Sequence, residues 1–159
     1  MAESSINSGI QFESYKLDNI SFSMITEVDI LAKKQYPNCE IKYQFAFRNA
    51  LRLKKTDRVL YVTGLKIDLM IFDKDTSKQI ATGSFVITGL FSSTGDFSKE
   101  VEENLIKFQA PTILFPYIRA SISLILTTAG FSGVILPLIN VTEAAKSLNL
   151  EIEDACFKE

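Results

Sequence analysis

The stretch that decides the fold is APTILFPYIR at residues 110–119, where two prolines stand among large apolar side chains. Apolar residues continue to Leu126 and occupy nearly every side of a helix that begins at Pro111. Proline suits the first turn of a helix, where its missing N–H would be unpaired in any case. A helix that is apolar all round must be covered on several sides. Since one sheet covers only one side, the stretch predicts that a second subunit covers the rest.

The residues on either side of this stretch predict where helices begin and end. Ser98 can cap an earlier helix with an acidic first turn. We expect Pro111 to interrupt that earlier helix. Gly130 stands where a glycine commonly ends a helix.

The C-terminal part predicts one more helix. Residues 132–138 are an apolar loop or extended segment. Asn140 and Glu143 then have the spacing of a capping box, with Asn in place of the usual Ser or Thr. A short helix from Val141 to about Leu148 should follow.

The N-terminal half predicts a sheet, because apolar and polar residues alternate in four segments joined mostly by short polar turns. The predicted strands are Phe12–Met24, Ile41–Leu53, Val59–Phe72 and about Gln79–Phe91. The alternation in the first slips at Asp18, which either a β-bulge or two short strands would explain. Four strands followed by two helices predict an α+β fold with the helices on one face of an antiparallel sheet.

The chain length and its composition indicate one globular domain. The 159 residues are 47% hydrophobic, too apolar for a disordered chain. We expect a flexible tail at residues 1–10, a single domain at residues 11–150 and a short charged tail at residues 151–159. Residues 25–40 form a long connection. The net charge of −2 gives no electrostatic footprint for nucleic acid.

The residue types present argue against catalysis. The chain has no histidine, so the commonest general base and metal ligand are missing. Cys39 and Cys156 form no CxxC motif, and free thiols in a reducing cytosol are the simplest interpretation. Glu102 and Glu103 are best interpreted as a solvated acidic face. We predict no catalytic residue, no metal and no cofactor.

A cytoplasmic protein without membrane insertion is the expected class. The N-terminus has neither the basic nor the apolar region of a signal peptide. The apolar segment Ile113–Leu138 contains prolines, glycines and Arg119, so it offers no clean run of about 20 apolar residues.

Three motifs resemble the SecB export-chaperone family. The stretch Pro111–Arg119 is similar to its P-x-I-L-F-P-Y-x-R motif, and Gly130-Phe131 and Asn140 follow in similar order. Asn19-Ile20-Ser21-Phe22 resembles the family's D-I-S-F, and Gly89-Leu90-Phe91 resembles its G-I-F. The resemblance covers about residues 12–148.

The resemblance implies a fold, an assembly and an activity. It implies a four-stranded antiparallel sheet with two helices, pairs of subunits and a tetramer that is a dimer of dimers. The candidate interface residues on the long helix are Leu114, Tyr117, Ile118, Ile122 and Ile125. It also implies an ATP-independent holdase that binds unfolded polypeptides or preproteins in hydrophobic grooves. The candidate groove residues are Tyr36 and Pro37 in the crossover, Phe45 and Phe47 in the second strand, and Val141, Ala145 and Leu148 in the last helix.

The sequence departs from the family where the export branch docks on the motor protein SecA. That branch uses acidic residues, whereas the matching positions here are Asn19, Ser23 and Ser84. The alternative hypothesis is therefore a SecB-like interaction module that serves one client, such as an antitoxin, without delivery to SecA.

Overall fold

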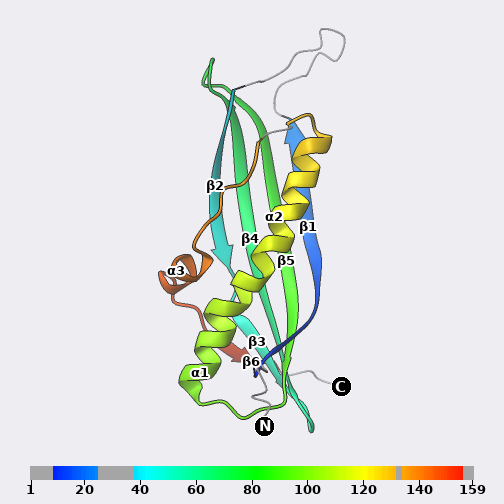
Figure 1. Ribbon diagram of the computed structural model, residues 1–159, viewed down its shortest axis with the longest axis vertical. Helices are drawn as coiled ribbons and strands as arrows, with labels where there is room; N and C mark the ends of the chain where they lie inside the picture. Colours follow the sequence, from blue (N-terminus) through cyan, green and yellow to red (C-terminus); the bar gives the residue numbers. More distant parts are fainter. Residues whose placement is uncertain (1–8, 25–37, 132–133, 156–159) are drawn as a thin grey trace, which may run out of the picture.

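The computed structural model describes residues 9–24, 38–131 and 134–155. One sheet, mostly antiparallel, carries its helices on a single face (Figure 1), so the predicted α+β fold is confirmed. The sheet order is β1-β5-β4-β3-β6, and β2 also pairs with β4. The elements are β1 Gln11–Met24, β2 Cys39–Phe47, β3 Ala50–Lys54, β4 Val59–Asp73, β5 Gln79–Ser93, α1 Lys99–Glu103, η1 Asn104–Gln109, α2 Ala110–Thr128, α3 Val141–Lys146 and β6 Ile152–Asp154.

The second predicted strand, Ile41–Leu53, is divided into β2 and β3. Phe47 lies opposite Leu65, and Leu51 lies opposite Val62. Between these two pairs, the segment that joins β2 to β3 therefore contains one residue more than β4 does. The extra residue reverses the facing of the side chains. Leu51 and its neighbour Leu53 consequently lie on the helix-free face, whereas one unbroken strand over Ile41–Leu53 would place them on the face of Phe45.

The slip in the first strand is a β-bulge. Leu17 lies opposite Ile87 and Asn19 lies opposite Val86, which leaves Asp18 as an extra residue within one continuous strand. The hydroxyl of Thr88 donates a hydrogen bond to the Asp18 carboxylate and lowers its pKa. The bulge is the correct one of the two explanations, and it keeps Tyr15 and Phe22 on the helix side of the sheet.

The helical run from Lys99 to Thr128 is continuous over 30 residues. Its start is as predicted, because the Ser98 hydroxyl accepts a hydrogen bond from the Val101 N–H at 3.3 Å. Pro111 does not interrupt it. The preceding turns, η1, widen to π-helical geometry, and the Ala110 N–H donates to the Leu105 carbonyl five residues back. The sequence pattern did not show that π-helical turns before Pro111 would let the helix continue through it.

This helical run is long and apolar enough to cross a membrane by length and composition alone, a test that the core helix of a soluble protein also passes. Here α2 packs on β4 and β5, where its inner side chains are buried. The fully buried ones include Leu114, Ile118, Ile122 and Leu126.

Both predicted signals after α2 are confirmed. Gly130 has a φ of 94°, and the Phe131 N–H donates to the Leu126 carbonyl at 2.8 Å, so the helix ends in a glycine cap. The Asn140 side chain accepts a hydrogen bond from the Glu143 N–H at 3.1 Å. Helix α3 ends at Lys146, slightly before the predicted Leu148.

The C-terminal segment adds a strand that the sequence pattern did not predict. Within the segment expected to be a charged tail, β6 pairs with β3, and in parallel. Ala50 lies opposite Ile152, and Arg52 lies opposite Asp154. A strand of three residues is too short to show any alternation, and its position depends on side chains of β3.

Gly89 is the position where α2 approaches the sheet most tightly among the described glycines of the strands. A Cβ there would lie 2.5 Å from Leu114 Cδ2 and 2.9 Å from Phe91 Cε2, both in buried side chains. Gly89→Ala should therefore lower the free energy of unfolding by about 1–3 kcal/mol through overpacking. Urea unfolding measures the change.

Gly95→Ala is the matched control. The nearest atom to a Cβ at Gly95 is 3.9 Å away, so the variant should stay within about 0.5 kcal/mol of the parent. Equal stability of the two variants would contradict the tight approach of α2.

Candidate functional site

Strand β2 lies beside the part of the sheet that α2 covers (Figure 1), and an aromatic row of its side chains is on the helix side. Tyr43 and Phe45 have ring centroids 5.5 Å apart, and Phe45 and Phe47 lie 6.5 Å apart. The ring of Phe115, from α2, lies 6.0 Å from that of Phe45. Tyr43 is exposed and the two phenylalanines are half-buried. The row therefore offers apolar surface beside the helix.

Residues 134–140 run along the same side of α2 toward α3 (Figure 1). Arg119, one turn after Phe115, donates from Nε to the Leu136 carbonyl at 2.8 Å, and Leu136 itself is buried. In the same segment Ile135 is 60% exposed and Leu138 is 81% exposed. We call the aromatic row together with these two residues the β2 surface; its members are Tyr43, Phe45, Phe47, Ile135 and Leu138.

The candidate groove residues have different positions in the structure. Phe45 and Phe47 belong to the β2 surface, and Leu148 is 43% exposed after α3. Val141 and Ala145 are core residues, with exposed fractions of 3% and 0%. Tyr36 and Pro37 lie outside the described residues.

Sequence reasoning missed Tyr43, Ile135 and Leu138. Tyr43 stands in the same alternation as Phe45, which was the available signal. The apolar run at residues 134–139 was visible too, but it did not show that Arg119 binds the Leu136 carbonyl or that Ile135 and Leu138 are exposed. That contact joins two segments that no local pattern relates.

The backbone of β2 is open along its outer edge. The Arg48 N–H donates to the Gly64 carbonyl, and the Lys74 N–H donates to the Asn38 carbonyl, so the even-numbered residues of β2 face β4. The N–H and C=O groups of Tyr43, Phe45 and Phe47 consequently point away from β4. Among the described strands, none pairs with this edge.

A second apolar surface lies on the opposite flank of α2, next to β1. The rings of Tyr117 and Tyr15 are 4.5 Å apart, and Phe12 lies 5.5 Å from Tyr117. Tyr15 is 45% exposed, Tyr117 38% and Leu124 69%. We call this surface, made by Phe12, Tyr15, Tyr117 and Leu124, the β1 surface.

Of the five candidate interface residues, three have no exposed surface in the single chain. Leu114, Ile118 and Ile122 are 0% exposed and pack against the sheet of their own subunit. Their side chains leave no area for a partner. Tyr117 lies on the β1 surface, and Ile125 is half-buried.

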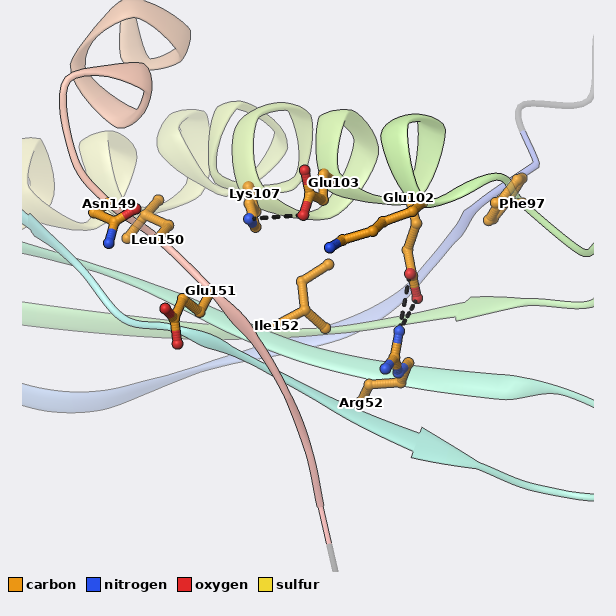
Figure 2. A pocket seen from close by; sticks show the side chains of 10 residues that line it. Arg52, Phe97, Glu102, Glu103, Lys107, Asn149, Leu150, Glu151 and Ile152 are labelled. Carbon is orange, nitrogen blue, oxygen red and sulfur yellow. Dashed lines mark hydrogen bonds and ion pairs between the residues drawn. The ribbon is translucent and has the colours of Figure 1, made fainter.

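A polar cleft of about 620 Å³ lies between the start of the long helix and the segment that enters β6 (Figure 2). Arg52 Nη1 contacts both carboxylate oxygens of Glu102 at 2.9 Å, and the Tyr61 hydroxyl donates to Glu102 at 2.8 Å. Arg52 Nε donates to Asp154 at 2.7 Å. Lys107 lies 3.2 Å from Glu103. The charged groups of this cleft are largely paired with one another.

The contacts in this cleft raise the pKa values of Arg52 and Tyr61 and lower that of Asp154. The hydrogen bonds to Asp154 and Glu102 raise the pKa of Arg52. Burial, then the hydrogen bond to Glu102, raise the pKa of Tyr61. The hydrogen bond from Arg52 lowers the pKa of Asp154. Among the described residues no group of three His, Cys, Asp or Glu side chains is placed to hold a metal.

Comparison with known proteins identifies the family. The family model described as preprotein translocase subunit SecB matches residues 4–145, which is most of the chain. The chain belongs to the SecB family. SecB is a family of chaperones and not of enzymes. No individually curated protein matches the chain by sequence.

A solved structure has the same SecB-like fold. It is the Mycobacterium tuberculosis Rv1957 SecB-like chaperone in complex with a ChAD peptide from the Rv1956 HigA1 antitoxin. The TM-score is 0.62 at 13% identity, and the match covers 82% of this chain and 90% of the other.

The structure also places the three SecB positions that differ from the export branch. Asn19 lies opposite Val86, Ser23 opposite Thr82, and Ser84 opposite Ser21. All three lie on the helix-free face of the sheet, away from both apolar surfaces. The side chains at these three positions are polar and uncharged, whereas the resemblance to the export branch led us to expect acidic ones.

Arg52→Gln should raise the pKa of Asp154 toward the usual aspartate value, because the strongest cause of its depression is the Arg52 hydrogen bond. A depressed carboxyl pKa stabilises the folded state above the unfolded-state pKa of about 3.9, and this contribution is lost as pH falls through the folded pKa. The stability difference between parent and variant should thus be largest near neutral pH and shrink in acid. NMR titration of the Asp154 carboxyl measures the shift.

Lys55→Gln is the control for this titration, since Lys55 is not among the causes of the Asp154 shift. An Asp154 pKa that stays low in Arg52→Gln would contradict the assignment.

Proposed function

We propose that this SecB-family chain is an ATP-independent holdase that binds extended segments of non-native polypeptides on the β2 surface. The observation that carries the proposal is the exposure of Ile135 and Leu138 in the segment that runs along the β2 side of α2 (Figure 1). Exposed apolar surface of this kind marks binding sites. Burial of apolar area supplies about 25 cal/mol per Å² before ordering costs, and it requires no nucleotide.

The open edge of β2 supports an extended geometry for the bound segment. An added strand would pair with the outward N–H and C=O groups of Tyr43, Phe45 and Phe47. Every second side chain of that strand would then lie over the aromatic row. Backbone pairing does not depend on sequence, whereas the apolar contacts select hydrophobic segments. This combination suits a chaperone with many clients.

We further propose assembly in the cytoplasm as a homotetramer, a dimer of dimers, as the family resemblance implies. The β1 surface is the candidate for one of its interfaces. Tyr15, Tyr117 and Leu124 are exposed together on one flank, and β1 is an edge strand of the sheet. A second copy would cover both the side chains and the strand edge. The assembly would leave the β2 surface, on the opposite flank of α2, available to clients.

A dedicated client is the second candidate function. The neutral side chains of Asn19, Ser23 and Ser84 favour it, because an export role requires docking on SecA. The relative Rv1957 is seen with a peptide from an antitoxin. A dedicated module would bind one partner tightly and would ignore generic unfolded chains, whereas a general holdase would bind a permanently unfolded model protein and not its native form.

Ile135→Ser combined with Leu138→Ser should weaken binding of a fluorescent, permanently unfolded model protein about 10- to 100-fold. The reason is the loss of two apolar side chains that a bound segment covers only in part, so that together they contribute about 1.4–2.8 kcal/mol, less than the roughly 1.5–3 kcal/mol that each would contribute when fully buried. Fluorescence anisotropy measures the change, and the native form of the model protein serves as the negative control.

Met70→Ser is the matched variant, since Met70 is 36% exposed on the helix-free face of the sheet. It should bind the unfolded protein as the parent does. If the Ile135 and Leu138 variant also bound with unchanged affinity, the β2 surface would be ruled out as the client site.

Tyr117→Asp should dissociate the assembly, because it places a charge in an apolar interface. Light scattering should report a smaller mass than that of the parent, while Met70→Asp should keep the parent's mass. A Tyr117→Asp protein with the mass of the parent would remove the argument for assembly through the β1 surface.

A further inference from the structure

The outer edge of β3 carries contacts that neither apolar surface uses. The Ala50 N–H donates to the Glu151 carbonyl at 3.0 Å, and the Ala155 N–H donates to the Arg52 carbonyl at 2.8 Å. These bonds hold β6 parallel to β3 over three residues. Parallel pairing is somewhat weaker per residue than antiparallel pairing. So short a strand needs further contacts to stay in place.

Side chains at the start of β3 supply these contacts and select acidic residues. The Asn49 side-chain carbonyl accepts from the Glu151 N–H at 3.0 Å, and its amide donates to the Glu153 carboxylate at 2.8 Å. Arg52 Nε donates to the Asp154 carboxylate at 2.7 Å. The successive carboxylates of Glu153 and Asp154 thus each accept a hydrogen bond, from Asn49 and Arg52, and both donors lie along the β3 edge.

The donor at Arg52 is oriented by groups outside β6. Its other nitrogen contacts both oxygens of Glu102, and Tyr61 in turn donates to Glu102. Figure 2 shows Arg52 against Glu102, and the two side chains are only 21% and 13% exposed. The guanidinium thus keeps its position whether or not a strand is bound, and such preorganisation lowers the cost of binding.

The segment that occupies this edge is held by exposed groups. The Asp154 side chain is 64% exposed, and Glu153 is exposed as well. Each contact at an exposed carboxylate adds little stability, so the three-residue strand stays paired only by a small margin. A competing polypeptide with the same pattern has only that margin to overcome.

From these contacts we propose that the β3 edge is a second polypeptide-binding site, separate from the β2 surface. Its ligand is a short extended segment of another polypeptide, with an apolar residue followed by two acidic residues. The chain's own residues 151–155 occupy the site and act as a tethered competitor. A short tether gives an effective concentration on the order of millimolar, so a partner gains access only by displacing β6.

The test uses the full chain with Glu153→Lys and Asp154→Lys together. The probe is a fluorescent peptide of residues 150–155, LEIEDA, and the control peptide is LEIKKA. Hydrogen exchange at the Ala50 N–H reports whether β6 is in place. In the double variant this N–H should lose protection, and LEIEDA should bind at least about tenfold more tightly than it binds the unchanged chain. LEIKKA should not bind. Adding Asn49→Ala to the double variant should weaken LEIEDA binding again.

Each other result overturns the proposal. Retained protection at Ala50 would show that the acidic contacts do not hold the segment. Lost protection without tighter LEIEDA binding, or equal binding of LEIEDA and LEIKKA, would show that the freed edge is not a selective site. The variants leave the β2 surface unchanged, so binding of the unfolded model protein should equal that of the parent. A failure of this site is thereby distinguished from a failure of the holdase function.

Discussion

The close packing of α2 on β4 and β5 is the constraint on which the rest of the structure depends. Gly89 permits it, because any Cβ would meet Leu114 and Phe91. A helix seated over the middle of a sheet cannot also cover both of its flanks. β1 lies uncovered on one side with Tyr15, and β2 on the other with Tyr43. The position of α2 thus leaves two apolar surfaces, for which we propose a second subunit and a client as the respective partners.

Arg52 has a comparable role at the end of the long helix. Arg52 contacts Glu102 of the long helix and Asp154 of the C-terminal strand. Glu102 in turn accepts a hydrogen bond from Tyr61 in the centre of the sheet, so the three elements are joined. Partly buried, mutually hydrogen-bonded charges of this kind specify a single arrangement when every member is satisfied. The same residue that fixes the helix also presents a donor at the edge of β3, so structural and recognition roles share one side chain.

The fold class followed from local signals, and the predicted sites followed only in part. Ser98, Gly130 and Asn140 cap helices as their spacing predicts, since capping is a contact within a few residues. Alternation placed Phe45 and its neighbour Tyr43 on one face of the strand, whereas the groove role of Phe45 came from the family resemblance and stays a prediction. Val141 and Ala145 were expected at a groove but are buried, because a pattern of apolar positions does not distinguish core from exposed surface.

The sequence by itself determined the α+β class, the order of the elements and the family resemblance, because periodicity, caps and the proline motif are properties of neighbouring residues. The tertiary structure alone decided the extra residue that divides β2 from β3, the passage of the helix through Pro111, the exposure of Ile135 and Leu138, and the pairing of β6 with β3. Each of these depends on contacts between segments far apart in the chain. The free energy of such contacts is set by packing and orientation, which no local pattern contains.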